Sequence, residues 1–279
     1  MTDIEFQGVG FVYPDGTRAL DGVDLRIPAG QRVGIIGQNG SGKSTLVRHC
    51  NGLLRPTEGR VLLDGEDVVT RRVAALAARV GIVFQNPDRQ IFAGRVAAEV
   101  AFGPRMLGRS AAEADMAARD ALAAVGLADT TQMNPYDLGY SRRKLLALAS
   151  VLAMATPVLI LDEPTTGQDA RGTARVQQVV ADVAAAGRTV IAISHDMRFV
   201  AGTFDRIVVM GAGRIVLDGP PETVFGEPSW PVLASTFVEP PLAARVGVRL
   251  GLGATPTESS LVTAIGERLR SRPEGASEA

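Results

Sequence analysis

The chain is poor in cysteine and lysine, and the cysteine shortage excludes whole classes of site. Cys50 is the only cysteine among 279 residues, so no disulfide can form within the chain. A metal site built from several thiolates is excluded for the same reason. The scarcity of cysteine is consistent with a protein of the reducing cytosol. Only two of the 29 basic residues are lysines, Lys43 and Lys144. This bias makes Lys43 informative, because arginine would fit badly where it sits.

Long apolar runs and an excess of charge are also missing. The longest apolar stretch, residues 145–161, is broken by Pro157 and is shorter than the roughly 20 residues of a spanning helix. The first residues carry acids and no apolar core, so we expect no secretory signal. The formal net charge of −1 argues against a broad nucleic-acid-binding surface. We expect a soluble protein that docks from the cytoplasmic side if it serves a membrane process.

Apolar segments and turn signals alternate along a chain that is 46% hydrophobic, as in a globular α/β protein. Strands are predicted at residues 4–13, 23–27, 33–36, 61–63, 80–84, 158–161, 190–193, 207–210 and 215–217. Helices are predicted at residues 43–51, 111–125, 142–155 and 171–185. This order predicts a largely parallel sheet with helices on both faces.

Two segments interrupt the alternation. Residues from about 95 to 155 are rich in alanine and helical in periodicity, which indicates a helical subdomain inserted in the core. From residue 226 onward, prolines separate short helical pieces before a polar tail at residues 271–279, which we expect to be disordered. We therefore divide the chain into a domain at residues 1–225 and an appended segment at 226–279.

Residues 37–44 form a glycine-rich loop of the type that cradles phosphate. They read Gly-Gln-Asn-Gly-Ser-Gly-Lys-Ser, a complete G-x-x-x-x-G-K-S between a predicted strand and a predicted helix. Glycines allow the backbone N–H groups to approach a phosphate, and a helix that begins near Lys43 points its positive end there. Lys43 would contact the β- and γ-phosphates, and the Ser44 hydroxyl would bind Mg²⁺.

Two later strands end in polar residues that suit hydrolysis. Asp162 and Glu163 follow the apolar strand at 158–161, where Asp162 can reach Mg²⁺ and Glu163 can orient or deprotonate the attacking water. His195 follows the strand at 190–193 and could contact the γ-phosphate. The other histidine, His49, lies on the helix after the loop, and we interpret it as structural.

The order of these motifs resembles the nucleotide-binding domain of ABC transporters over residues 1 to about 225. The resemblance implies a P-loop NTPase (RecA-like) core of largely parallel sheet, with an antiparallel β region at the N-terminus, an inserted α-helical subdomain and a C-terminal helical extension. It also implies that Gln85 contacts Mg²⁺ and the lytic water, and that Tyr13 stacks on adenine. An ordinary strand-end aromatic remains the alternative for Tyr13. The implied nucleotide-binding residues are Tyr13, Gly37, Gln38, Asn39, Gly40, Ser41, Gly42, Lys43, Ser44 and Thr45; Ser44, Gln85 and Asp162 would bind the metal, and Lys43, Gln85, Glu163 and His195 would be catalytic.

A closer resemblance is to energy-coupling-factor (ECF) importers and their cobalt and nickel relatives. It rests on residues 85–92, on Glu-Val-Ala-Phe-Gly-Pro at 99–104, and on the C-terminal segments 240–241, 244–246 and 250–252. The resemblance implies an ATPase, using ATP and Mg²⁺, at the cytoplasmic face of the membrane. It also implies three partners: a second ABC ATPase subunit, a transmembrane coupling subunit and a substrate-binding membrane subunit. The cargo would be a vitamin or a transition-metal ion, and the C-terminal extension would serve dimerisation.

The signature of the ABC family is altered in this chain. Where the family has Leu-Ser-Gly-Gly-Gln, residues 138–142 read Leu-Gly-Tyr-Ser-Arg. In the family this motif closes on the γ-phosphate held by the other subunit. Either this chain pairs with a different ATPase that has an intact signature, or it forms a homodimer in which Ser141 and Arg142 substitute. We favour the heterodimer, and we interpret the charges of Arg142, Arg143 and Lys144 as a solvated basic face.

Other functions fit the residues less well. A soluble ABC ATPase of DNA repair or translation would carry a coiled-coil insertion or tandem cassettes, and a small P-loop kinase would lack Gln85 and His195 in this order. A non-hydrolytic or regulatory subunit is compatible with the altered signature, but Lys43, Asp162 and Glu163 are intact.

Overall fold

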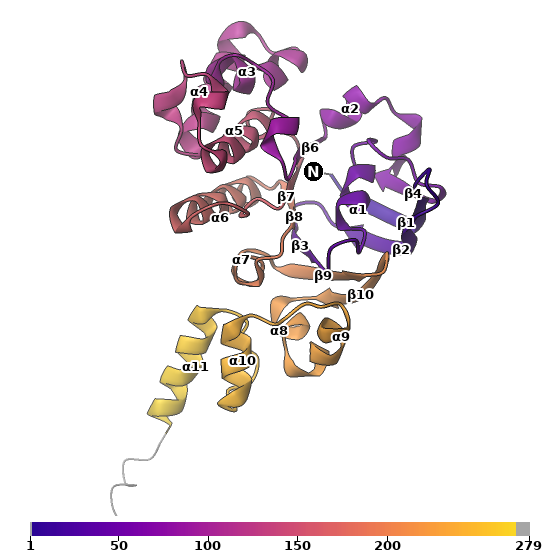
Figure 1. The fold of residues 1–279 in the computed structure, drawn as a ribbon, viewed down its shortest axis with the longest axis vertical. Coiled ribbons are helices and arrows are strands. Elements are labelled where there is room, and N and C mark those ends of the chain that lie inside the picture. Colours follow the sequence, from indigo (N-terminus) through magenta and orange to yellow (C-terminus); the bar gives the residue numbers. More distant parts are fainter. Residues whose placement is uncertain (1, 272–279) are drawn as a thin grey trace, which may run out of the picture.

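The computed structural model describes residues 2–271 and has a six-stranded sheet at its centre (Figure 1). The strand order is β10-β9-β3-β8-β7-β6. Five strands are parallel, and β10 pairs antiparallel to β9 at the edge, so the prediction of a largely parallel sheet is confirmed. The strands are β3 (Arg32–Ile36), β6 (Val80–Val83), β7 (Val158–Asp162), β8 (Thr189–Ile193), β9 (Arg206–Gly211) and β10 (Arg214–Gly219).

A second, antiparallel sheet is formed by the N-terminal part of the chain, as expected. Its order is β2-β1-β4-β5, from β1 (Ile4–Val12), β2 (Arg18–Ile27), β4 (Glu58–Leu63) and β5 (Glu66–Asp67). Strand β2 begins five residues before the predicted start at Val23, because Ala19 and Leu20 are buried beside β1. Two short helices lie in this region, α1 (Lys43–His49) and α2 (Val73–Ala77).

The five parallel strands of the central sheet are buried on both faces, which explains their continuous apolar sequences, whereas the edge strand β10 is partly exposed. Along β7, Val158 and Ile160 join a core shared with the N-terminal sheet and α1. Their neighbours Leu159 and Leu161 join the core on the opposite face, where α6 (Ala170–Ala185) and α7 (Met197–Thr203) pack. Alternate side chains of one strand thus anchor two separate cores, so the strand is held rigidly where it ends.

A helical insertion lies between β6 and β7 in the chain and at one end of the molecule (Figure 1). It contains α3 (Val96–Met106), α4 (Ala111–Ala124) and α5 (Tyr140–Leu152). Helix α4 begins at a capping box formed by Ser110 and Glu113. Helix α5 begins two residues before the predicted start at Arg142 and ends three residues before Ala155, whose φ of 55° is incompatible with a continuing helix.

The C-terminal segment lies at the opposite end of the molecule (Figure 1). Helix α8 (Pro221–Val224) precedes this segment, whose helices are α9 (Trp230–Ser235), α10 (Leu242–Arg249) and α11 (Glu258–Arg270). Short 3-10 turns occur at Val68–Thr70, Pro87–Arg89, Ala128–Thr130, Pro135–Asp137 and Glu227–Ser229. The predicted disordered tail lies, except for Ser271, outside the described residues. No helix between residues 2 and 271 is long and apolar enough to cross a membrane.

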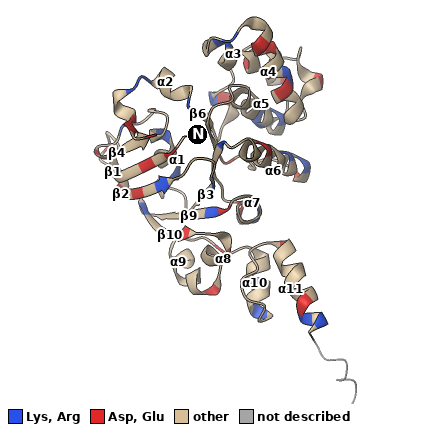
Figure 2. Ribbon diagram, turned by 180° about the vertical axis from the view of Figure 1, so that it is seen from behind, with Lys and Arg blue, Asp and Glu red and all other residues tan. Residues whose placement is uncertain are grey.

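The strand register brings the polar ends of the central strands to one edge of the sheet. Ile35 of β3 pairs with Ile193 of β8, and Ile193 pairs in turn with Asp162 of β7. Val83 of β6 pairs with Leu161. Because these strands are parallel, the segments that follow them leave the sheet side by side. Both signs of charge occur on the helical insertion and on the N-terminal sheet (Figure 2).

Candidate active site

A pocket of about 270 Å³ lies at the carboxyl edge of the central sheet. Its walls come from the N-terminal sheet, the loop after β3, the segment after β6, and the ends of β7 and β8. The pocket contains most of the predicted site residues: Tyr13, Asn39, Gly40, Gly42, Lys43, Ser44, Thr45, Gln85, Asp162, Glu163 and His195. The fold therefore gathers residues from positions 13 to 195 around one space.

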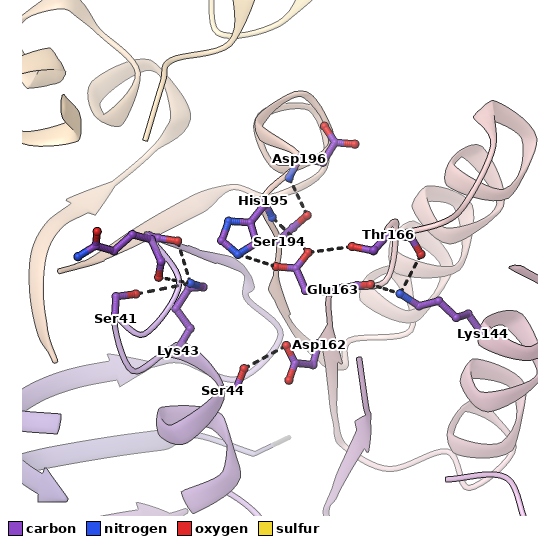
Figure 3. Close-up of polar contacts among 12 residues, drawn as sticks. Ser41, Lys43, Ser44, Lys144, Asp162, Glu163, Thr166, Ser194, His195 and Asp196 are labelled. Carbon is purple, nitrogen blue, oxygen red and sulfur yellow. Dashed lines mark hydrogen bonds and ion pairs between the residues drawn. The ribbon is translucent and has the colours of Figure 1, made fainter. Parts of the chain in front are cut away.

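The glycine-rich loop wraps around the Lys43 ammonium. Lys43 Nζ donates to the carbonyl oxygens of Gly37 and Gln38 at 2.8 Å each and lies 3.5 Å from Ser41 Oγ (Figure 3). A Cβ on Gly37 would lie 2.2 Å from the Met210 carbonyl oxygen, so a side chain there would break the loop. Burial is the main cause that lowers the pKa of Lys43. The charge is therefore poorly solvated and available to phosphate oxygens.

Gly40 shows how the loop leaves room for a ligand. Its φ is 80°, and a Cβ built there meets nothing within 4 Å, although the residue lines the pocket. A side chain would extend into open space rather than into protein. The absence of a side chain at this position therefore keeps the approach to the loop clear, as a bound phosphate requires.

Oxygen donors suited to Mg²⁺ meet beside the loop. Ser44 Oγ donates to Asp162 Oδ1 at 3.3 Å, and Gln85 lines the same pocket. Burial raises the pKa of Asp162 above its ordinary value, so a nearby cation would stabilise the charged form. Within residues 2–271 no group of three His, Cys, Asp or Glu side chains could hold a metal ion. These residues fit Mg²⁺ only as a partial ligand set that phosphate oxygens complete.

Glu163 lines the pocket and lies between His195 and Thr166 (Figure 3). Glu163 Oε2 accepts from Thr166 Oγ1 at 3.2 Å and from the His195 backbone N–H at 3.3 Å. Glu163 Oε1 lies 3.2 Å from His195 Nε2. This carboxylate oxygen is buried and accepts no hydrogen bond of good geometry. Burial is the largest cause raising the pKa of Glu163. A buried carboxylate oxygen that accepts no other hydrogen bond can accept one from a water molecule and hold that water in position.

Tyr13 follows β1 and also lines the pocket. Its hydroxyl lies 3.0 Å from Thr45 Oγ1, and its ring packs edge-on against Phe11. Four further residues, Thr17, Arg18, Ala19 and Ile193, also line the pocket and were not predicted as site residues. The turn that follows Tyr13 could have indicated Thr17, Arg18 and Ala19, because it brings the chain back to the wall of the pocket that contains Tyr13. His49 is fully buried against Phe11, in agreement with a structural assignment.

The altered signature occupies the start of α5. Gly139 is the N-cap and provides no side-chain cap. Ser141 Oγ donates to Gln168 Oε1 at 2.7 Å, and Gln168 Nε2 donates back to the Ser141 carbonyl at 3.0 Å. The segment after β7, which contains Gln168, is thereby tied to the start of α5.

The interpretation of residues 142–144 as a solvated basic face was wrong for Lys144. This side chain is only 4% exposed, and its ammonium group donates to the carbonyl oxygens of Glu163 and Thr166. Arg143 is half-buried. It donates to the Leu138 carbonyl and forms an ion pair with Asp88 at 3.0 Å. Sequence spacing could not reveal the contacts with Asp88, Glu163 and Thr166, because these residues lie on other segments.

Comparison with known proteins agrees with this geometry. The family model described as "ABC transporter" matches residues 20–166. An energy-coupling factor transporter ATP-binding protein EcfA2 from Symbiobacterium thermophilum is 45% identical over 229 residues, which cover 80% of each chain. The EcfA protein from Methanosphaera stadtmanae is 41% identical over 226 residues, covering 80% of this chain and 81% of its own.

Solved structures lead to the same group. CbiO1 from Clostridium perfringens, described as part of the ABC transporter complex CbiONQ, superposes with a TM-score of 0.74 at 33% identity, covering 89% of this chain and 95% of its own. A dimeric ATP-binding cassette in a post-hydrolysis state with ADP and phosphate gives a TM-score of 0.72 at 25% identity, covering 78% of this chain and 98% of its own.

The chain belongs to the ABC transporter family, among the ATP-binding subunits of energy-coupling factor transporters. It is an ATP-hydrolysing transporter subunit, and the comparisons give no support to the soluble or regulatory alternatives.

Proposed function

We propose that this chain, at the cytoplasmic face of the membrane, hydrolyses ATP as one half of an ATPase pair that drives an importer of a vitamin or a transition-metal ion. The observation that carries the proposal is that residues following four parallel strands, Glu163 among them, line one pocket with the glycine-rich loop. The names of the relatives support the ECF type, and the description of CbiO1 supports a complex with membrane subunits.

In this proposal the glycine-rich loop and Lys43 bind the β- and γ-phosphates, and Tyr13 stacks on the adenine. Ser44, Asp162 and Gln85 would hold Mg²⁺, which neutralises phosphate charge when it is bound. The contact between Ser44 and Asp162 supports this ligand set, because it brings the two oxygens to the same side of the loop.

Hydrolysis then depends on Glu163 and His195. Glu163 Oε1 orients and deprotonates the attacking water, since its other carboxylate oxygen is already engaged by Thr166 and the His195 backbone. The raised pKa of Glu163 strengthens it as a base. His195 is 46% exposed in its side chain and faces the pocket, where it can contact the γ-phosphate.

The pairing partner is a different ATPase subunit in our proposal. The contacts of the signature segment support this choice. Gly139 has no hydroxyl, and the Ser141 hydroxyl that could replace it already donates to Gln168. The signature segment therefore offers no free side-chain hydroxyl to the partner's nucleotide. A partner with an intact signature would complete the site around Glu163.

A second hollow would receive the transmembrane coupling subunit. It has a volume of about 570 Å³ and is lined by Arg48, Leu53, Leu54, Phe84, Gln85, Asn86 and Arg89. Gln85 lines both this hollow and the ATP pocket, so a partner seated here would contact the residue that reaches Mg²⁺. Phe92 and Phe102 lie nearby in the chain, stack edge-on and are exposed, which favours an apolar partner.

Residues 226–279 would serve as the dimerisation extension. Large apolar side chains there are exposed: Phe237, Leu242, Leu250, Val262 and Leu269. Helix α11 buries none of its residues in the single chain. A second ATPase subunit would cover these side chains and gain the free energy of burying them.

Replacing Glu163 with glutamine tests the proposal. We expect Mg-ATPase turnover to fall by about 100-fold or more, as for the loss of a general base, while ATP binding persists. The matched control is Glu99→Gln, an equally buried carboxylate outside the pocket that binds the Phe92 and Ala93 backbone N–H groups. Undiminished turnover in Glu163→Gln would contradict the assignment. Rates measured against protein concentration, alone and with candidate partner ATPases, distinguish a homodimer from a heterodimer.

A further inference from the structure

Both lysines of the chain lie beside the same carboxylate pair. Lys43 comes from the glycine-rich loop and Lys144 from α5, and each side chain is less than one-tenth exposed. Asp162 and Glu163 are the acidic groups that act on both lysines. The other 27 basic residues are all arginines. The proposed function gives Lys43 a role, and it leaves Lys144 without one.

Lys144 reaches the backbone of the segment that carries Glu163. Its ammonium group donates to the Glu163 carbonyl and, at 3.1 Å, to the Thr166 carbonyl (Figure 3). These two carbonyls bracket the turn that follows β7. The side chain of Thr166 in turn donates to Glu163 Oε2. Lys144 therefore holds both ends of a turn whose last residue orients the carboxylate.

This turn needs support because Glu163 has an unfavourable backbone conformation. Its φ is 53°, in the left-handed region that residues other than glycine seldom adopt. The backbone N–H of Glu163 donates to the Ile193 carbonyl at 2.9 Å, which fixes one side of the peptide. Lys144 fixes the other side by binding the carbonyl. Removing Lys144 would free the turn to relax and the carboxylate to move.

An ammonium group suits this position better than a guanidinium group. Two carbonyl oxygens converge on one buried atom, Nζ, which has three donors in a compact tetrahedral arrangement. The planar fork of arginine spreads its donors and requires more room. Burial lowers the pKa of Lys144 to about 8, so the position costs free energy that exposed basic residues avoid.

We propose that Lys144 is a positioning residue for Glu163: it fastens the turn after β7 to α5 and so aims the Glu163 carboxylate at the attacking water. The proposal rests on the function proposed above for Glu163. It assigns Lys144 to the hydrolytic step of its own subunit and not to the nucleotide of the partner. It also predicts that nucleotide binding is independent of Lys144, since no Lys144 atom lines the pocket.

The test compares Lys144→Met and Lys144→Gln with the native chain. All are measured in the assembly, with or without a partner ATPase, in which the native chain hydrolyses ATP. Methionine keeps much of the stem and removes all donors, whereas glutamine retains an amide donor. We expect kcat to fall by about tenfold to a hundredfold in Lys144→Met, as for a misplaced catalytic group. Lys144→Gln should fall less, and the Kd for a fluorescent ATP analogue should stay unchanged in both. Leu122→Ala, a buried change on α4 outside the pocket, is the control for lost stability.

The outcomes separate this proposal from the function on which it rests. A kcat in Lys144→Met close to the native value, with Glu163→Gln inactive, overturns the positioning role and leaves the ATPase assignment intact. Parallel losses of kcat and ATP affinity, matched by Leu122→Ala, also overturn it, because they indicate a general structural role. If Lys144→Met does not fold, Lys144→Gln decides: reduced kcat with unchanged Kd supports positioning, and native kcat refutes it. An active Glu163→Gln refutes the proposed function itself.

Discussion

The pair formed by Ser141 and Gln168 allows a quantitative test of how the altered signature is held. Two hydrogen bonds join these residues: the Ser141 hydroxyl donates to the Gln168 side-chain oxygen, and the Gln168 amide donates to the Ser141 backbone carbonyl. Both residues are half-buried, and the bonds connect α5 with the segment after β7. We expect Ser141→Ala, Gln168→Leu and the double variant to show a large energetic coupling.

The expected magnitudes follow from the number of bonds lost. Ser141→Ala removes one bond and should lower the free energy of unfolding by about 0.5–1.5 kcal/mol. Gln168→Leu removes both and should cost about 1–3 kcal/mol. Once Gln168 is gone, the Ser141 hydroxyl has no partner there to lose. The double variant should therefore resemble Gln168→Leu, which corresponds to a coupling energy of about 0.5–1.5 kcal/mol.

Urea unfolding of the four proteins, at equal m-values, measures this coupling. Independent sites add to within about 0.3–0.5 kcal/mol, so additive losses would refute the reciprocal pair. Turnover provides a second readout. If the pair holds the segment after β7 in place, the two single variants should reduce kcat in the same order in which they reduce stability.

Three further predictions concern other parts of the chain. Tyr13→Ala should weaken ATP binding by roughly threefold to tenfold through loss of the stacking ring, whereas Tyr13→Phe should not; equal affinities in calorimetry would refute stacking. Phe237→Ser with Leu242→Ser, at side chains 82% and 72% exposed, should shift sedimentation toward monomer, unlike the control Met116→Ser on α4. Burial raises the pKa of Cys50 to about 12, so the native chain should resist thiol reagents at pH 8 and react once unfolded; rapid native labelling would contradict this.

The architecture and part of the pocket could be predicted because they depend on local patterns, whereas Tyr13 and Gln85 were expected only from the family resemblance. Apolar runs that end in polar residues identify parallel strands and their carboxyl ends, whatever lies between them. Asp162, Glu163 and His195 could therefore be assigned to the same edge as the glycine-rich loop. The pocket of the structure brings them together.

The contacts around α5 could not be predicted, because they depend on which segments meet in space. Three adjacent residues, Arg142, Arg143 and Lys144, look alike in the sequence, yet their surroundings differ. Arg142 pairs with Asp129 near the surface, Arg143 with Asp88, and Lys144 is buried against the turn after β7. Helical periodicity places side chains on faces, but it does not identify what covers each face.

The position of β3 has a consequence for the order in which the chain can fold during synthesis. This strand is the centre of the main sheet, but its neighbours are β8 and β9, and Arg32 pairs with Val190. No strand partner exists until nearly 160 further residues have been made, so a nascent chain carries the glycine-rich loop on an unpaired strand. Contacts this distant in sequence form slowly, and unpaired edges attract other chains. Ribosome-bound chains that stop before residue 189 should therefore depend on chaperones, and nucleotide should protect the chain only after β8 has emerged.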